Sequence, residues 1–468
     1  MSFINKFIGD RRFYRTVLTV SVPIMIQNGI TNFVNLLDNI MVGSLGTEQM
    51  SGVSIVNQFV FVFNLLIFGA ISAAGIFTAQ YHGYGDEEGE RNTFRFKFVI
   101  NLAAGLLGVA AFYFFDDQLI SLFLHDGSDM GDIVKTLGFG KQYLKIMLVG
   151  LIPYAIAQVY ASTMRETGQT IVPMTASIIA VFTNFVLNYI LIFGKLGIAP
   201  LGVRGAAIAT VVSRFAELAV LLIWGYTHKK RCPYLVGAFR RFHIPVSLCA
   251  SITAKGLPLM LNEFLWSVAV TFRNQCYSTR GLDVVAAQNI SSTIFNVFSV
   301  VYMALGSAIA IVVGNLLGAA KLDEAKDTAR KMITFSVFCA LGIGAILIVC
   351  SGVFPSLYNT TEHVRYIASY MMIVSAFTMP MCAFANAAYF TMRSGGKVLI
   401  TLLFDSVYMW SVVIPIAYVT AHFTNVNIYI LFAICQSTEV LKAAFGFFLI
   451  KRGTWVKQLV ANDSLKKA

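Results

Sequence analysis

The sequence predicts an all-α polytopic membrane protein with twelve transmembrane helices, arranged as two parallel six-helix repeats. Three observations predict this fold: the composition, the spacing of long apolar runs, and an internal repeat. Hydrophobic residues make up 57% of the 468 residues, charged residues only 12%, and the mean hydropathy is +0.72. Since an average soluble domain has about a quarter of its residues charged, the composition excludes a soluble enzyme, a secreted disulfide-rich protein and a disordered chain.

Apolar runs long enough to cross a bilayer recur along the chain. The hydrocarbon core of a bilayer is about 30 Å thick and needs about 20 apolar helical residues. The runs lack the alternation of polar and apolar residues that transmembrane β-strands show, so we expect helices. The predicted spans cover residues 16–42, 51–80, 97–115, 136–163, 172–194, 204–227, 256–279, 284–317, 331–353, 364–392, 398–420 and 425–450.

The basic residues of the loops predict the orientation in the membrane. Cytoplasmic loops carry an excess of Lys and Arg. In this chain the basic residues fall near both ends and in alternate loops, whereas the acidic stretch 116–132 contains none. We therefore expect both termini in the cytoplasm. The basic residues of the N-terminal segment and the second loop are Lys6, Arg11, Arg12, Arg15, Arg91, Arg95 and Lys97.

The two halves of the sequence repeat each other. Ser21–Gly46 aligns without gaps with residues 256–281, and Pro23 then matches Pro258. Segments 83–88 and 162–165 also match 318–323 and 390–393. Six spans in each half bring both halves into the membrane from the same side, so the repeats are parallel, as in transporters that rock two lobes. We expect an N-terminal lobe over 1–228, a cytoplasmic linker over 229–255, and a C-terminal lobe with a cytoplasmic tail over 256–468.

A membrane-embedded enzyme is the alternative from another functional class. Its usual signatures are missing from the sequence. The six histidines fall in loops or at span ends and form no cluster with metal-ligand spacing. No nucleophile–base pair stands out, and there is no Walker-type loop for ATP. The basic tracts lack the interleaved aromatic residues that nucleic-acid binding requires. We therefore predict a protein that is not an enzyme and binds neither ATP nor nucleic acid.

Several motifs together resemble the multidrug and toxic compound extrusion (MATE) transporters of the bacterial type. The most specific stretch begins with RETGQT at 165–170 and ends with PLGVRGAAIAT at 200–210. The segment LDNIMVG at 37–43 fits equally well, and the resemblance covers nearly the whole chain. It implies two lobes around a V-shaped cavity and export of cationic, amphipathic compounds in exchange for Na⁺ or H⁺. A flippase for lipids or lipid-linked oligosaccharides, from the same broad superfamily, is the alternative.

The resemblance also implies a location and a set of partners. We expect a multi-pass protein of the bacterial inner (plasma) membrane. Its partners are expected to be small-molecule substrates and the lipid bilayer, and the protein itself a monomer. No cofactor is expected apart from the coupling ion.

Asp38 is the first candidate for a coupling site. A charged side chain in mid-bilayer is unfavourable by roughly 2.5–3.5 kcal/mol on insertion scales, so it needs a partner or a function. The resemblance places the counterpart of Asp38 in a cation site, with Asn184, Asn188 and Thr210 at neighbouring polar positions. One carboxylate with amide and hydroxyl oxygens can hold Na⁺, or the carboxyl group can bind a proton. Asn188 stands where some family members carry a second carboxylate, which puts a two-carboxylate scheme in doubt. A capping or packing role for Asp38 is the alternative.

The second half carries more charges within its spans. A second cation or proton site is predicted there, and a static ion-pair network around Lys442 is an equally good interpretation. Arg273 aligns with Asp38, so the two lobes cannot share one ion mechanism. The charged residues of this predicted site are Glu263, Asp405, Glu439, Lys442 and Arg273.

Two further predictions concern the remaining polar and aromatic residues of the spans. Arg214 and Glu217, which align with Glu439 and Lys442, are three residues apart, and we interpret them as a structural pair within one helix. Lining of the cavity is predicted for Phe59, Phe63, Trp266, Phe295 and Met303.

Overall fold

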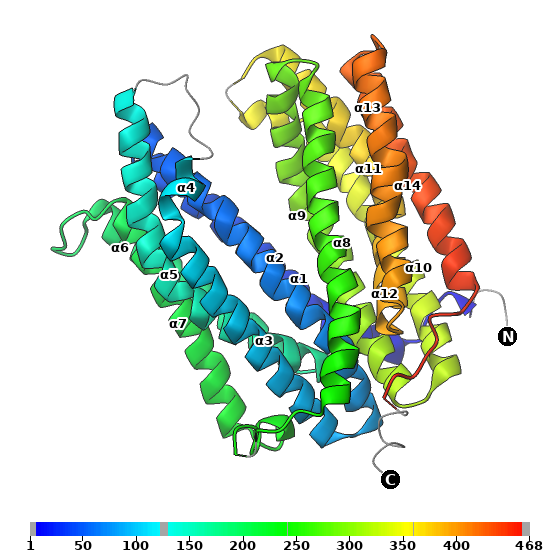
Figure 1. Ribbon diagram of the computed structural model, residues 1–468. Coiled ribbons are helices and arrows are strands. Elements are labelled where there is room, and N and C mark those ends of the chain that lie inside the picture. The colour runs from blue at the N-terminus through cyan, green and yellow to red at the C-terminus, as the bar shows by residue number, and fades with distance from the viewer. Residues whose placement is uncertain (1–5, 122–129, 241, 359, 461–468) are drawn as a thin grey trace. The chain divides into compact units, whose positions relative to one another are not determined.

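The computed structural model describes residues 6–121, 130–240, 242–358 and 360–460, and within these ranges the chain is helical without β-strands (Figure 1). The all-α prediction is therefore confirmed. The acidic stretch 116–132 that was used to orient the chain lies partly outside the described residues, since 122–129 are not included.

Six long helices form the first half of the chain. The bounds of its helices are α1 (Arg11–Gly43), α2 (Thr47–Tyr84), α3 (Glu87–Phe114), the short α4 (Asp116–Ser121), α5 (Met130–Glu166), α6 (Ile171–Phe193) and α7 (Val203–Thr227).

The second half repeats this pattern. The bounds are α8 (Val246–Ser278), α9 (Leu282–Gly318), α10 (Leu322–Ser351), α11 (Glu362–Ser394), α12 (Val398–Leu402), α13 (Ile414–Phe423) and α14 (Ile428–Lys451). Two π-helical stretches, Leu403–Val407 and Met409–Val413, join α12 and α13 into one span, Val398–Phe423. Short 3₁₀ turns lie at Pro233–Leu235 (η2) and Phe354–Leu357 (η3).

Eleven helices in the described part of the chain are long and apolar enough to cross a membrane. The twelfth predicted span, in α8, is not among them because Asn262, Glu263 and Arg273 interrupt its apolar sequence. With 33 residues, α8 is nevertheless long enough to span a bilayer at 1.5 Å per residue, and it is the repeat counterpart of α1. The fold thus supplies the twelve predicted membrane helices.

The chain divides into two compact units. The first unit contains Ile26–Thr78 and Asp86–Ile252, and the second contains Met1–Met25, Ala79–Gly85 and Thr253–Ala468. Helices α1, α2 and α8 therefore each contribute residues to both units.

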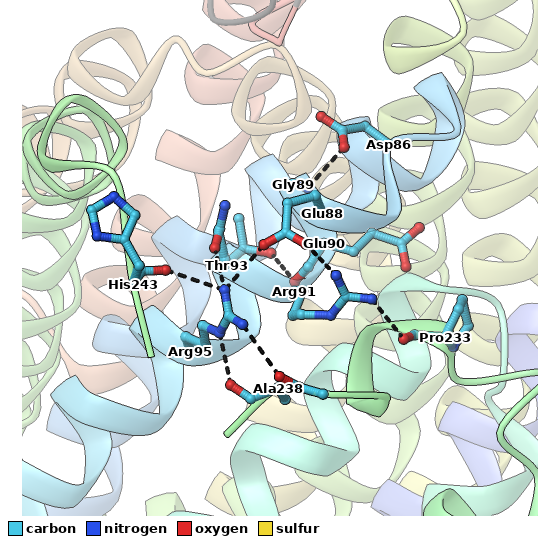
Figure 2. Close-up of polar contacts among 12 residues, drawn as sticks. Asp86, Glu88, Gly89, Glu90, Arg91, Thr93, Arg95, Pro233, Ala238 and His243 are labelled. Carbon is cyan, nitrogen blue, oxygen red and sulfur yellow. Dashed lines mark hydrogen bonds and ion pairs between the residues drawn. The ribbon is translucent and has the colours of Figure 1, made fainter. Parts of the chain in front are cut away.

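The segment between α7 and α8 is bound tightly to α3 within the first unit (Figure 2). Arg95, which is 4% exposed, donates from Nε to the Ala238 carbonyl (2.7 Å), and from its terminal nitrogens to the carbonyls of His243 (3.1 Å) and Gly237 (3.4 Å). A guanidinium group has five N–H donors in a fixed plane, so one arginine can hold several carbonyls at once. Arg91 donates to the Pro233 carbonyl at 3.3 Å.

Apolar packing strengthens this attachment. Tyr234 and Leu235 of η2 are buried in a core cluster with Phe94 of α3, and the Phe94 and Tyr234 ring centroids are 5.7 Å apart. The segment that the sequence predicts as a linker is thus, over residues 233–240 and 242–243, a packed element of the first unit.

Replacing Arg95 with alanine is expected to release this connecting segment. Three backbone carbonyls lose a charged donor, and such hydrogen bonds contribute about 1.5–3 kcal/mol each. Hydrogen–deuterium exchange of the peptide covering 233–243 should then accelerate at least about tenfold. The matched control is Arg231→Ala, since Arg231 is exposed. Equal exchange in the Arg95 variant and the unmodified protein would contradict the attachment.

Candidate functional site

Close packing of α6 against α7 positions the polar residues of the first unit. A Cβ atom added to Gly205 would lie 2.7 Å from the backbone of Leu191, so only glycine allows this approach. Ala207 and Ala209 are fully buried on α7 as well. Small residues let membrane helices come together in this way. The GAAIAT part of the sequence motif therefore brings Thr210 of α7 next to α6.

The structure brings Asp38 together with the three polar residues predicted around it. Asn188 Nδ2 donates to Asp38 Oδ1 at 2.7 Å. The Asn184 amide is better placed with its nitrogen toward Asp38, because the opposite orientation turns its oxygen toward the two carboxylate oxygens. With its oxygen toward Asn188 it accepts at 3.1 Å, and with its nitrogen there it donates to both Asp38 oxygens at 2.9 and 3.1 Å. In both orientations Asn184 is bonded to Thr210 Oγ1 at 3.2 Å.

One oxygen of the cluster formed by Asp38, Asn184, Asn188 and Thr210 (the Asp38 cluster) lacks a hydrogen-bond donor in the described part of the chain. Asn188 Oδ1 is buried and has no hydrogen-bond donor among the described residues. A buried polar atom without a partner is unfavourable by about 1–3 kcal/mol. Because this oxygen lies in the cluster that contains a carboxylate, a hydroxyl and a second amide, a bound cation would supply the missing partner.

The Asp38 carboxylate accepts hydrogen bonds from amides, and no basic side chain of the described residues forms an ion pair with it. Arg214 lies near enough for its charge to act on Asp38. However, the Arg214 guanidinium is bonded to Glu217 at 3.4 Å, within α7 as predicted, and lies 4.6 Å from the ring centroid of Tyr154. Among the described residues, then, no cation is paired with this acid.

A small cavity adjoins the Asp38 cluster. Its volume is about 20 Å³, and its lining includes Thr210, Arg214, Asn64 and Tyr154. One water molecule needs roughly 10–15 Å³ of such volume, so the cavity holds a single water-sized particle. Tyr143, whose hydroxyl lies 3.5 Å from Asn57 Oδ1, also interacts with Thr210. No pattern in the sequence pointed to Asn64, Tyr143 or Tyr154, since single polar residues in apolar spans have many structural uses.

The second unit contains a different charged cluster. Lys442 Nζ of α14 donates to Asp405 Oδ1 at 2.6 Å, and Asn262 Nδ2 of α8 donates to Asp405 Oδ2 at 3.1 Å. Asn262 is itself fixed by Ser406, which donates to its side-chain oxygen at 2.8 Å. Asp405 lies in the π-helical stretch Leu403–Val407, and such departures from α-helical geometry are frequent at functional sites.

The other charged residues predicted for this site lie around the Asp405–Lys442 pair. Glu263 accepts from the Tyr389 hydroxyl at 3.2 Å. Glu439 is near enough for its charge to act on Lys442, but among the described residues it forms no ion pair within 4.0 Å. The intrahelical pairing that the spacing of Glu439 and Lys442 allowed is therefore not formed, because Lys442 reaches across to Asp405 instead. Arg273, Glu439 and Lys442 all lie near the half-buried thiol of Cys382.

The residues predicted to line a cavity lie in different surroundings. Phe59 and Phe63 are only 9% and 3% exposed and belong to a core cluster of the first unit, so they are core residues rather than cavity-lining ones. Phe295 is half-buried against a cluster of the second unit. Trp266 and Met303 are 39% and 48% exposed within the second unit.

Twelve membrane helices in two repeats, with buried acids and amides inside the helical units, define a polytopic transporter of the two-lobe type. A family model described as MatE matches residues 23–190 and again 258–419. The chain belongs to the MatE family and is a transporter, not an enzyme. The double match also confirms the internal repeat.

Relatives and solved structures agree with this assignment. The chain is 24% identical over 426 residues to the probable multidrug resistance protein YoeA of Bacillus subtilis, covering 89% of this chain and 88% of that one. It is 23% identical to the probable multidrug resistance protein NorM of Thermotoga maritima, with 95% and 94% covered. A solved MATE structure in complex with MaL6 superposes with a TM-score of 0.86 at 20% identity, covering 98% of this chain and 100% of that one.

Proposed function

We propose that this protein is a secondary antiporter that exports cationic, amphipathic compounds in exchange for Na⁺ or H⁺. One observation carries the proposal: Asp38 is an acid inside a membrane helix that is bonded to neutral amides, and no cation in the described part of the chain is paired with it. The relatives named as multidrug resistance proteins support the export of several kinds of compound.

The Asp38 cluster provides what a coupling ion needs. Sodium would take oxygen ligands from Asp38, from the unpartnered Asn188 Oδ1 and from Thr210. The Asn184 amide can turn its oxygen toward a bound cation or its nitrogen toward an unoccupied carboxylate. A proton on Asp38 would neutralise the same charge. Both ions therefore act at one group, and either changes the net charge buried in the first unit.

Coupling follows from differences in affinity between conformations. A bound ion shifts an equilibrium between two states only by the difference in its affinity for them. If the Asp38 cluster has its present geometry in only one state, ion binding favours that state. By reciprocity, a cargo that favours the other state weakens ion binding by the same factor. This is the thermodynamic basis of alternating access of the two lobes.

The orientation and assembly of the transporter are part of the proposal. The pattern of basic loop residues supports cytoplasmic termini in the plasma membrane. We further propose that the protein acts as a monomer without ATP, since each half carries its own buried polar cluster.

The proposal is tested by transport in proteoliposomes with the Na⁺ and pH gradients imposed separately. Movement of a fluorescent cationic dye against its own gradient should respond to at least one of the two gradients. The gradient that drives the dye identifies the coupling ion. Dye movement that is independent of both gradients would contradict an ion-coupled antiporter.

A further inference from the structure

The two units contain the same chain of three polar side chains at positions related by the repeat. In the first unit Gln27 Nε2 donates to Ser177 Oγ at 2.8 Å, and Ser177 Oγ donates to Glu217 Oε1 at 3.1 Å. The repeat counterparts of Gln27, Ser177 and Glu217 are Asn262, Asp405 and Lys442. In the second unit these three are joined in the same order, at 3.1 and 2.6 Å.

The last residues of these two hydrogen-bonded series carry opposite charges. The first unit has a neutral hydroxyl in the middle and a carboxylate, Glu217, at the end. The second unit has a carboxylate, Asp405, in the middle and an ammonium, Lys442, at the end. Asp405 therefore already holds a cation supplied by the chain, in contrast to Asp38. A cation from solution can bind Asp405 only if Lys442 leaves it.

The Asp405–Lys442 pair is largely buried, but part of the Asp405 side chain stays accessible. The side chain of Asp405 is 18% exposed and that of Lys442 is 9% exposed. Besides Asp405, the ammonium contacts the face of the Phe404 ring, 5.5 Å from its centroid. Lys442 also has a long, flexible side chain, so its ammonium can reach more than one position.

Glu439 provides a second position for the ammonium. It lies three residues before Lys442 on α14, a spacing that places two side chains on one helix face. Its charge acts on Lys442, although the two groups are not at ion-pair distance. Removing one partner of a buried ion pair usually leaves an uncompensated charge, which is strongly unfavourable. A move of Lys442 from Asp405 to Glu439 avoids this, because the ammonium exchanges one carboxylate for another.

We propose that the Asp405–Lys442 pair recognises cargo. A cationic group of the cargo binds Asp405, and the Lys442 ammonium moves to Glu439. This inference rests on the proposed export of cationic compounds, since a neutral cargo would not compete with Lys442. Amidinium and ammonium groups are the favoured cargo chemistry because they donate charge-assisted hydrogen bonds to a carboxylate.

Equilibrium binding of the fluorescent diamidine dye DAPI to the purified full-length protein in detergent tests the competition. Lys442→Gln removes the competing cation, and the dye should bind about tenfold more tightly, because the apparent affinity rises with the fraction of Asp405 that is free. Lys442→Arg keeps the charge and should bind as the unmodified protein does. Lys145→Gln, at an exposed lysine of α5, controls for the change in net charge. Unchanged or weaker binding to the Lys442→Gln variant would overturn the proposal.

Glu439→Gln separates a mobile lysine from a static ion pair. The Asp405–Lys442 bond stays intact in this variant, but the ammonium loses its second position, so the dye should bind more weakly. The same substitution made together with Lys442→Gln should have no effect, because there is no longer an ammonium to move. A static pair would make Glu439→Gln silent in both backgrounds, and direct contact of Glu439 with the dye would weaken binding in both. Either result would overturn the proposal.

One further variant keeps the test decisive. Lys442→Gln with Asp405→Asn removes both charges and should fold, but it should lose the tight dye binding. This double variant replaces the single one if a lone Asp405 prevents folding, and tight binding to it would overturn the proposal. Failure of the proposed function is recognised separately. In that case neither the unmodified protein nor any of the variants would bind the dye.

Discussion

The Asp38→Asn variant is expected to fold normally and to lose ion-driven export of a cationic dye. Asparagine keeps the shape of the side chain and an oxygen that accepts from Asn188, but it carries no charge and cannot be protonated at this oxygen. Coupling free energies of 1–3 kcal/mol between two sites correspond to changes in binding affinity of roughly 5–150-fold. The Asp38→Asn substitution removes this coupling entirely. The initial rate of gradient-driven transport in proteoliposomes should therefore fall at least about tenfold.

A matched control is available in the same unit. Asp117 undergoes the same chemical change in Asp117→Asn, but its side chain is 56% exposed and is bonded to Lys141 at the start of the membrane region. This variant should transport at the rate of the unmodified protein. Gradient-driven transport at the normal rate by the Asp38 variant would exclude Asp38 as the coupling group.

The fold was predictable because the bilayer imposes a simple rule on sequence. Each crossing needs about 20 apolar residues in a helix, and eleven such helices follow from apolar length alone. Helix α8 shows where the rule fails. Its polar residues Asn262, Glu263 and Arg273 lower its hydropathy, although the apolar run over 256–279 was predicted as a span and the alignment with α1 supports it. One of the polar residues that lower the hydropathy of α8, Asn262, is also the hydrogen-bond partner of Asp405.

The residues of the Asp38 cluster could be predicted from the sequence, but the hydrogen bonds among them could not. An acid in a span stands out because it is unfavourable there, and the family resemblance supplied its amide and hydroxyl neighbours. Which oxygen is left without a donor depends on the packing of α6 against α7, which Gly205 allows. No spacing in the sequence contains that information.

Pairing partners in the second unit could not be inferred from spacing. Glu439 and Lys442 lie three residues apart, and this distance along a helix predicts a pair. In the structure Lys442 instead bonds to Asp405, 37 positions earlier in the chain. Long side chains on a helix follow the direction set by their rotamers and neighbours, not by sequence distance alone. For the same reason Phe59 and Phe63, predicted to line a cavity, turn into the core.

The two units differ in how their central acids are neutralised. Asp405 is bonded to an ammonium of its own chain, whereas Asp38 is bonded to amides. A duplicated fold can thus use one lobe for an ion from solution and the other for a cationic cargo.

Lys97 is the position where the sequence-based interpretation differs most from the structure. As one of several basic residues in the second loop, it served to orient the chain. In the structure its side chain is fully buried, with Nζ bonded to Thr163 Oγ1 at 3.2 Å and paired with Glu166. Glu166 is part of the RETGQT motif. The motif thus supplies the acid that neutralises a buried lysine on the neighbouring helix.

Replacing Glu166 with glutamine is expected to destabilise the protein strongly. The change leaves the Lys97 ammonium buried without its counter-ion, and breaking a buried pair from one side is unfavourable by about 3–5 kcal/mol. The temperature of unfolding in detergent should fall by several degrees, measured from the intrinsic tryptophan fluorescence. Expression in the membrane should fall as well, because marginally stable variants are degraded.

Two comparisons decide whether the loss comes from the buried charge. Lys97→Met combined with Glu166→Gln removes both charges and should recover most of the lost stability, because replacing a buried ion pair by neutral groups of similar volume is often close to neutral. Asp323→Asn breaks an exposed pair with Lys326, at 3.2 Å, and should change stability by less than about 1 kcal/mol. If the single Glu166 variant unfolds at the same temperature as the Asp323 variant, then the Lys97 ammonium is solvated by water and the pair does not hold α3 against α5.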